Sequence, residues 1–163
     1  KPDSTMEIMN LLRDNFVLVY QGIGEDDEPE ITSKYRVELT WGRDPIDLDA
    51  GFKTSNGRRV NHLYRGNLNA FPYAWLREDI VDGFGPEIIY INALTSGTNR
   101  FYVEYLDDQP DLSGSQARVV LKDTDGAVLL DREIPEKSGR YWHVFDFIGE
   151  NLFIRDDVTN VMP

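Results

Sequence analysis

The sequence predicts an all-β fold, namely an antiparallel β-sandwich of the immunoglobulin/fibronectin-like or jelly-roll-like kind. From residue 33 onward, apolar and polar residues alternate with a period of two, as in residues 35–41, which is typical of strands with one buried face. Such segments recur between turns rich in Gly, Pro and Asp, so we expect about eight or nine short strands. No long amphipathic helical pattern recurs, which argues against a βαβ architecture.

The N-terminal part is expected to differ from the rest of the chain. A capping-box spacing of Ser and Glu predicts a short helix over residues 5–14. Residues 16–20 are apolar and predict a strand, and residues 22–30 predict an acidic loop containing Gly and Pro. We interpret residues 1–32 as a leader and residues 33–163 as the β-sandwich domain. The chain begins without an initiator Met or a signal sequence, so we expect a fragment of a longer protein.

Within the domain, each expected strand ends at a turn signal. The expected strands are residues 35–41, 60–64, 87–91, 101–105, 117–122, 127–134 and 140–148. The pair Asp125-Gly126 is typical of a two-residue hairpin turn. The side chains expected to share one interior are Tyr35, Val37, Leu39, Trp41, Phe101, Val103, Tyr105, Val119, Leu121, Tyr141 and Phe145.

The charge of the chain argues against two classes of partner. It carries 17 Lys and Arg against 29 Asp and Glu, a net charge of −12. Such a surface repels phosphate backbones and anionic lipid, so we expect neither a nucleic-acid partner nor membrane insertion. The chain has no cysteine, which excludes disulfides, cysteine–metal sites and cysteine nucleophiles.

Catalytic signatures are absent from the sequence. It contains neither G-x-S-x-G nor H-E-x-x-H. The two histidines, His62 and His143, are interpreted as hydrogen-bonded structural imidazoles rather than as ligands or bases. A glycosidase needs paired carboxylates across a cleft, and a sandwich of this size rarely has a deep one. We therefore expect a domain that is not an enzyme.

Two acidic segments, residues 39–49 and 76–87, carry the strongest candidate for a binding site. An Asp-x-Asp pair directs two carboxylates to one side of an extended chain, and a Gly-x-Gly-Pro-Glu turn returns another. Ca²⁺ takes oxygen ligands of this kind. The candidate calcium ligands are Asp47, Asp49, Asp79 and Glu87. The alternative is a salt-bridged turn cluster, in which the compensating guanidinium groups are Arg43, Arg58 and Arg77.

An aromatic segment offers a second candidate site. Phe71, Tyr73 and Trp75 lie in a loop-like stretch, residues 71–75, where exposed rings would form a platform for sugar rings. The alternative interpretation is that these side chains pack into the core. This segment is the basis for considering a carbohydrate-binding module.

Three motifs resemble those of a bacterial extracellular domain of unknown function. They are L-T-W-G-x-x-P-x-D-L-D at residues 39–49, D-x-x-x-G-[YF]-G-P-E at residues 79–87, and Y-W-x-V-F at residues 141–145. The resemblance covers roughly residues 33–155. The family occurs in surface proteins beside immunoglobulin-like or von Willebrand A-type modules, which implies a β-sandwich accessory domain with no assigned activity. The family commonly continues D-L-D-x-H, whereas the histidine position here is Gly51.

These observations predict a non-catalytic interaction module of a larger protein, serving adhesion or assembly and stabilised by calcium. We expect an extracellular or cell-surface location, with the periplasm as the alternative, and a protein or glycan partner at a cell surface. The alternative function is a carbohydrate-binding module.

Overall fold

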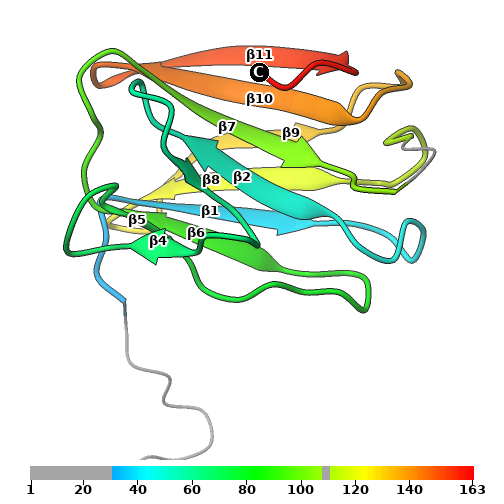
Figure 1. Cartoon of the computed structure of the whole chain (residues 1–163), viewed down its shortest axis with the longest axis horizontal. Coiled ribbons are helices and arrows are strands. Elements are labelled where there is room, and N and C mark those ends of the chain that lie inside the picture. Colours follow the sequence, from blue (N-terminus) through cyan, green and yellow to red (C-terminus); the bar gives the residue numbers. More distant parts are fainter. Residues whose placement is uncertain (1–30, 108–110) are drawn as a thin grey trace, which may run out of the picture. The chain divides into compact units, whose positions relative to one another are not determined.

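Two antiparallel β-sheets pack face to face in the computed structural model, which describes residues 31–107 and 111–163 (Figure 1). The 6-stranded sheet has the order β4-β5-β6-β1-β8-β9 and the 5-stranded sheet the order β11-β10-β7-β2-β3. The predicted all-β sandwich is confirmed. Within the described ranges there is no helix that could cross a membrane. The predicted helix at 5–14, strand at 16–20 and acidic loop at 22–30 lie outside the described residues.

Each sheet combines strands from distant parts of the chain. The 6-stranded sheet contains β4 (Gly66–Asn67), β5 (Ala74–Leu76), β6 (Glu87–Ile91), β1 (Tyr35–Thr40), β8 (Arg118–Asp123) and β9 (Val128–Glu133). The 5-stranded sheet contains β11 (Asn151–Thr159), β10 (Tyr141–Ile148), β7 (Thr98–Glu104), β2 (Asp49–Lys53) and β3 (Arg59–Val60). Strands β1, β6, β7, β8, β9 and β10 were predicted, whereas β2, β4, β5 and β11 were not.

The predicted strand at residues 60–64 is wrong. Only Arg59–Val60 joins the sheet as β3, and the chain then turns. The backbone N–H of Asn61 donates to Tyr64 O at 3.0 Å, and that of Tyr64 donates to Asn61 O at 3.2 Å. The Asn61 side-chain oxygen accepts a further hydrogen bond from Tyr64 N at 3.1 Å. Such local bonding by Asn favours a turn over a strand.

The core lies between the two sheets and contains most of the predicted interior set. Tyr105 is half-buried and packs against this core. Tyr141 is the exception, because the register of β10 against both neighbours shifts between His143 and Phe145. Such a bulge exchanges the faces of a strand. Trp142 is therefore in the core before the bulge and Phe145 after it, and Tyr141 lies on the outer face.

The predicted hairpin between β8 and β9 is confirmed, but its loop contains the three residues 124–126 rather than the two that were predicted. Asp123 N donates to Ala127 O and Gly126 N to Asp123 O, both at 3.0 Å. Gly126 has φ +80°, a conformation that glycine adopts without steric penalty.

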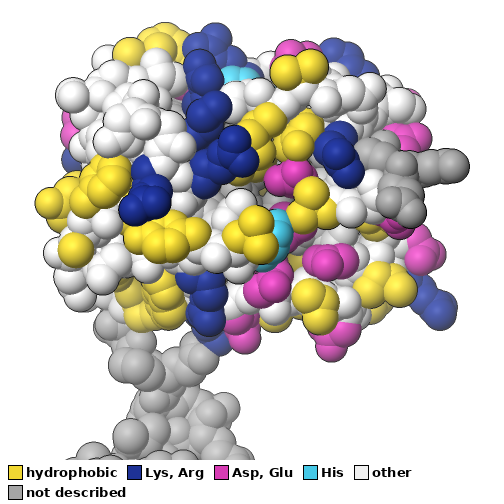
Figure 2. Space-filling model, in the orientation of Figure 1, with side chains coloured by type: hydrophobic (Ala, Val, Ile, Leu, Met, Phe, Trp, Pro, Cys, Tyr) yellow, Lys and Arg dark blue, Asp and Glu magenta, His cyan; other side chains and the backbone are white. Residues whose placement is uncertain are grey.

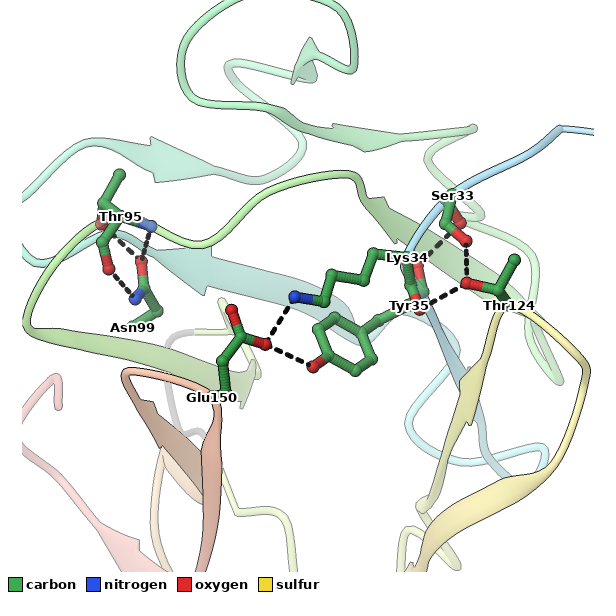
Figure 3. Close-up of polar contacts among 7 residues, drawn as sticks. All are labelled: Ser33, Lys34, Tyr35, Thr95, Asn99, Thr124 and Glu150. Carbon is green, nitrogen blue, oxygen red and sulfur yellow. Dashed lines mark hydrogen bonds and ion pairs between the residues drawn. The ribbon is translucent and has the colours of Figure 1, made fainter.

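The start of β1 is tied to turns of both sheets (Figure 3). The Tyr35 hydroxyl donates to Glu150 Oε2 at 3.2 Å, and Lys34 Nζ donates to the same oxygen at 2.5 Å. Thr124 Oγ1 donates to Ser33 O at 3.2 Å. Glu150 follows β10 and Thr124 follows β8, so these bonds fix β1 at the point where the described domain begins.

Candidate functional site

The acidic cluster is formed where the β1–β2 loop meets the β5–β6 loop, at the right-hand end of the sandwich in Figure 1. Asp47 lies in the first loop, Asp49 opens β2, and Asp79 lies in the second loop. One carboxylate oxygen from each lies within 4.8 Å of the other two. Three of the four predicted calcium ligands therefore converge. Figure 2 shows Asp and Glu side chains gathered on the right of this face.

The two loops are held together at Trp41, directly after β1. Its indole Nε1 donates to Ile46 O at 3.3 Å, and its backbone N donates to Phe84 O at 3.4 Å. Gly85 has φ +68°, and a Cβ there would lie 2.7 Å from Leu39 O. Only glycine fits that close approach without a shift. The Gly-Phe-Gly-Pro-Glu turn is thus pressed against the end of β1, which brings Asp79 towards Asp47.

Glu87, the fourth predicted ligand, is fully buried and lies outside the group of three. Its Oε2 accepts a hydrogen bond from Ala50 N at 2.7 Å, and its Oε1 accepts one from Ile80 N at 3.1 Å. Burial raises its pKa to about 8, although both backbone bonds lower it. Glu87 therefore joins β2 to the β5–β6 loop directly behind the cluster.

Asp49 is buried and has a histidine neighbour that the sequence did not indicate. His62 Nδ1 lies 2.6 Å from Asp49 Oδ1, although Nδ1 makes no aligned hydrogen bond within the described residues. Burial raises the pKa of Asp49 to about 7; His62 lowers it, and Asp47 and Asp79 raise it further. His62 belongs to the turn after β3, in the segment predicted as a strand.

Asp47 carries negative charge that is incompletely neutralised. Burial raises its pKa, the Asp79 carboxylate raises it further, and His62 lowers it. Its Oδ1 is buried and accepts no hydrogen bond from the described residues. Two of the arginines considered as partners interact elsewhere: the Arg58 guanidinium lies 4.7 Å from the centre of the Tyr64 ring, and Arg77 Nη2 lies 3.5 Å from a Glu78 oxygen.

Gly51 occupies the position at which the predicted resemblance commonly places a histidine. A Cβ built on Gly51 would lie 2.2 Å from Cζ of Tyr102. Tyr102 is fully buried although it lies on the outer face of the 5-stranded sheet, opposite Gly51 in the register. The space for a side chain at this position is therefore filled by the tyrosine ring, and the imidazole beside Asp49 is that of His62.

Gly51→Ala is expected to lower the free energy of unfolding by about 1–3 kcal/mol, because the methyl group overlaps the Tyr102 ring. Urea denaturation measures this loss. In a Tyr102→Ala background the same substitution should have little effect, since the overlapping ring is absent. An equal loss in both backgrounds would contradict the contact.

The aromatic segment divides between two surfaces. Phe71 and Tyr73 are 39% and 40% exposed and their rings meet edge to face at 6.5 Å. Trp75 lies in β5, so the loop prediction is wrong there, and it stacks on Tyr90 at 6.0 Å. Its neighbours in β5, Ala74 and Leu76, are fully buried. Their burial, together with pairing to β6, makes this stretch a strand.

The second histidine, His143, has the hydrogen-bond partner that was expected. His143 Nε2 lies 2.8 Å from Asp146 Oδ1. Arg155 Nε donates to Asp146 Oδ2 at 2.7 Å, and Arg100 Nε lies 3.4 Å from Asp146 Oδ1. These partners satisfy a buried carboxylate on the outer face of the 5-stranded sheet.

No family model matches the chain, and no solved structure matches it. The resemblance drawn from the three motifs therefore stays a prediction.

Proposed function

We propose that this domain is a non-catalytic, calcium-stabilised interaction module of an extracellular or cell-surface protein, with a role in adhesion or assembly. The observation that supports it is the convergence of carboxylate oxygens from Asp47, Asp49 and Asp79 within 4.8 Å. Ca²⁺ binds six to eight oxygens at about 2.3–2.6 Å. Three carboxylates, completed by backbone carbonyls and water, suit that shell.

The electrostatics of the cluster favour a bound cation. Burial raises the pKa of both Asp47 and Asp49, which means that their ionised forms lack sufficient compensation. The buried Oδ1 of Asp47 has an open acceptor site within the described residues. A depression of about 350 Å³ is lined by Asp47, Tyr105, Leu106 and Asp107. The depression opens beside Asp47, and the Asp107 carboxylate, which accepts a hydrogen bond from the Tyr105 hydroxyl, lies at its rim.

Millimolar Ca²⁺ is expected to raise the melting temperature relative to chelator. Extracellular calcium modules bind at about 10⁻⁴–10⁻³ M. With a dissociation constant at the tight end, 1 mM Ca²⁺ stabilises by about 1.4 kcal/mol, or roughly 3–6 °C for a domain of this size. Asp47→Asn should abolish the shift, because it removes one ligand charge. Thermal unfolding followed by circular dichroism measures both.

Asp125→Asn is the matched control, because it removes the same charge from an exposed hairpin turn. It should retain the full calcium shift. An identical melting temperature of the wild type in Ca²⁺ and in chelator would contradict a calcium site and leave a metal-free carboxylate cluster in contact with His62.

Carbohydrate binding is a second candidate function, supported by the exposure of neighbouring aromatic rings at Phe71 and Tyr73. Flat aromatic faces present apolar area at little entropic cost, while the tyrosine hydroxyl adds a hydrogen-bonding group. Trp75 faces Tyr90 and would not belong to the same platform. Saturable binding of a polysaccharide tests this function.

A further inference from the structure

Beside the exposed aromatic residues lies an open pocket of about 630 Å³ with a basic lining. Its lining residues are Asn56, Gly57, Arg58, Arg59, Tyr64 and Phe71. None of them is acidic, in a chain with a net charge of −12. Figure 2 shows basic and hydrophobic side chains next to one another on the left half of this face, away from most of the carboxylates on the right. The pocket is therefore chemically distinct from the acidic cluster.

The two arginines of the pocket have no carboxylate partner among residues 31–107 and 111–163. The guanidinium of Arg58 lies over the ring of Tyr64, 4.7 Å from its centre, a favourable cation–π geometry. Lys53 pairs with Arg59 in the register of β2 and β3. Burial lowers the pKa of Lys53, and Arg100 and Arg59 lower it further. The local potential is therefore positive although the chain as a whole is acidic.

The arginine side of the pocket is fixed by a hydrogen-bonded turn. Thr54 N donates to Arg58 O at 2.8 Å, and Gly57 N donates to Thr54 O at 2.9 Å. The Thr54 hydroxyl also bonds to the side-chain oxygen of Asn56 at 2.7 Å. This turn places Arg58 and Arg59 at the start of β3 without any help from a ligand.

The aromatic side is fixed as well. Tyr64 is held by its backbone pairing with Asn61. Phe71 lies in a turn that is closed by a hydrogen bond from Tyr73 N to the Ala70 carbonyl at 2.7 Å. The rings of Phe71 and Tyr73 meet edge to face. A preorganised pocket loses little conformational entropy when it binds.

We propose that this pocket binds the carboxylate-bearing sugar of an acidic polysaccharide, that is, a uronic acid residue. Arg58 and Arg59 supply planar guanidinium groups that match a carboxylate in bidentate geometry. Tyr64 and Phe71 supply apolar faces for the C–H side of the sugar ring. The inference rests on the carbohydrate-binding candidate and specifies the class of sugar and the residues that select it.

The shape and charge of the surroundings favour a polysaccharide over a nucleic acid. A duplex carries a charge every ~1.7 Å of its axis, and such a chain would meet the acidic remainder of the surface. A polyuronate carries its charge more sparsely, on each sugar ring. Across the turn at residues 54–58, a second depression of about 390 Å³ is lined in part by Lys53 and Gly57. Gly57 lines both the pocket and this second depression, and a Cβ built there would meet nothing within 4 Å. An extended sugar chain that crosses Gly57 therefore reaches both.

Isothermal titration of the whole chain with oligomers of galacturonic and mannuronic acid, each beside its neutral methyl ester, tests the proposal. The free acid of at least one series should bind at least about tenfold more tightly than its ester, because the ester cannot form charge-assisted hydrogen bonds. Arg59→Gln should weaken binding of the acid by about tenfold, and Tyr64→Ala by roughly fivefold.

Arg118→Gln is the matched control. It removes the same charge from an exposed arginine of β8 that pairs with Asp131, and it should leave sugar binding unchanged. Melting temperatures of all variants verify folding, and Arg59→Lys keeps the charge but loses the planar fork, so intermediate binding is expected.

Three outcomes would overturn the inference. Equal binding of acid and ester would remove the arginines from recognition while leaving carbohydrate binding intact. Absence of binding to every acid and ester would overturn both the inference and the carbohydrate-binding candidate. Binding of a DNA oligomer that is tighter than that of the polyuronates and is lost in Arg59→Gln would assign the pocket to phosphate.

Discussion

Val103→Asp is expected to unfold the domain or to lower its free energy of unfolding by about 4 kcal/mol or more, since an unpaired carboxylate would be buried. Val103 is fully buried in β7, which pairs with β10 on one side and β2 on the other. Far-ultraviolet circular dichroism and urea denaturation measure the loss. A domain of this kind has a total stability of about 5–15 kcal/mol, so the substitution removes a large part of it.

Val128→Asp provides the control for this prediction. Val128 is 57% exposed on the edge strand β9, and the same substitution there should change stability by no more than about 0.5 kcal/mol. Val103→Ala, which leaves a small cavity without a charge, keeps the prediction measurable if Val103→Asp does not fold. Unchanged urea midpoints in both Val103 variants would show that β7 does not face the core.

Strands in which apolar and polar residues alternate could be predicted from the sequence. β1 and β8 show this, because each buries every second residue against the opposite sheet. β2 could not be predicted, since a glycine such as Gly51 weakens a strand pattern. The structure explains this glycine, because the Tyr102 ring lies across it and leaves no room for a side chain. β11 was missed for a related reason. Its apolar residues Phe153 and Ile154 are exposed at the sheet edge, and Asp156 interrupts the strand with φ +49°.

The acidic cluster was partly predictable for a similar physical reason. Asp47 and Asp49 are two residues apart, so an extended backbone directs both carboxylates to the same side. The glycine-containing turn before Glu87 indicates a loop that brings the segment with Asp79 back towards them. The position of His62 carries no such signal. It reaches Asp49 from a turn after β3, and only the pairing of β3 with β2 brings that turn near. The basic pocket was missed because its residues come from several turns, none of which forms a motif.

Raising the pH from about 5 to about 8 is expected to lower the stability of the metal-free domain by a few kcal/mol. Burial raises the pKa of Glu87 to about 8 and that of Asp49 to about 7, whereas in the unfolded chain these groups ionise near about 4.3 and 3.9. In this window the folded state binds more protons than the unfolded state, so stability falls as the pH rises. Both states are protonated only well below about pH 4, and both are ionised above about pH 8. Urea midpoints in chelator measure the slope.

Glu87→Gln separates the contribution of this one carboxyl group from the rest. Its neutral amide cannot titrate, so the slope between pH 5 and pH 8 should become shallower and the remaining loss, due to Asp49, should end near pH 7. Asp131→Asn is the control, because a hydrogen bond from Arg118 lowers the pKa of Asp131 and keeps its titration below the window.

Ca²⁺ should oppose the loss of stability at high pH, because it binds the ionised carboxylates and must compete with protons at low pH. The stabilisation by calcium should therefore be larger at pH 8 than at pH 5.5. A free energy of unfolding of the metal-free wild type that stays constant from pH 5 to pH 8 would contradict the burial of an ionisable Glu87.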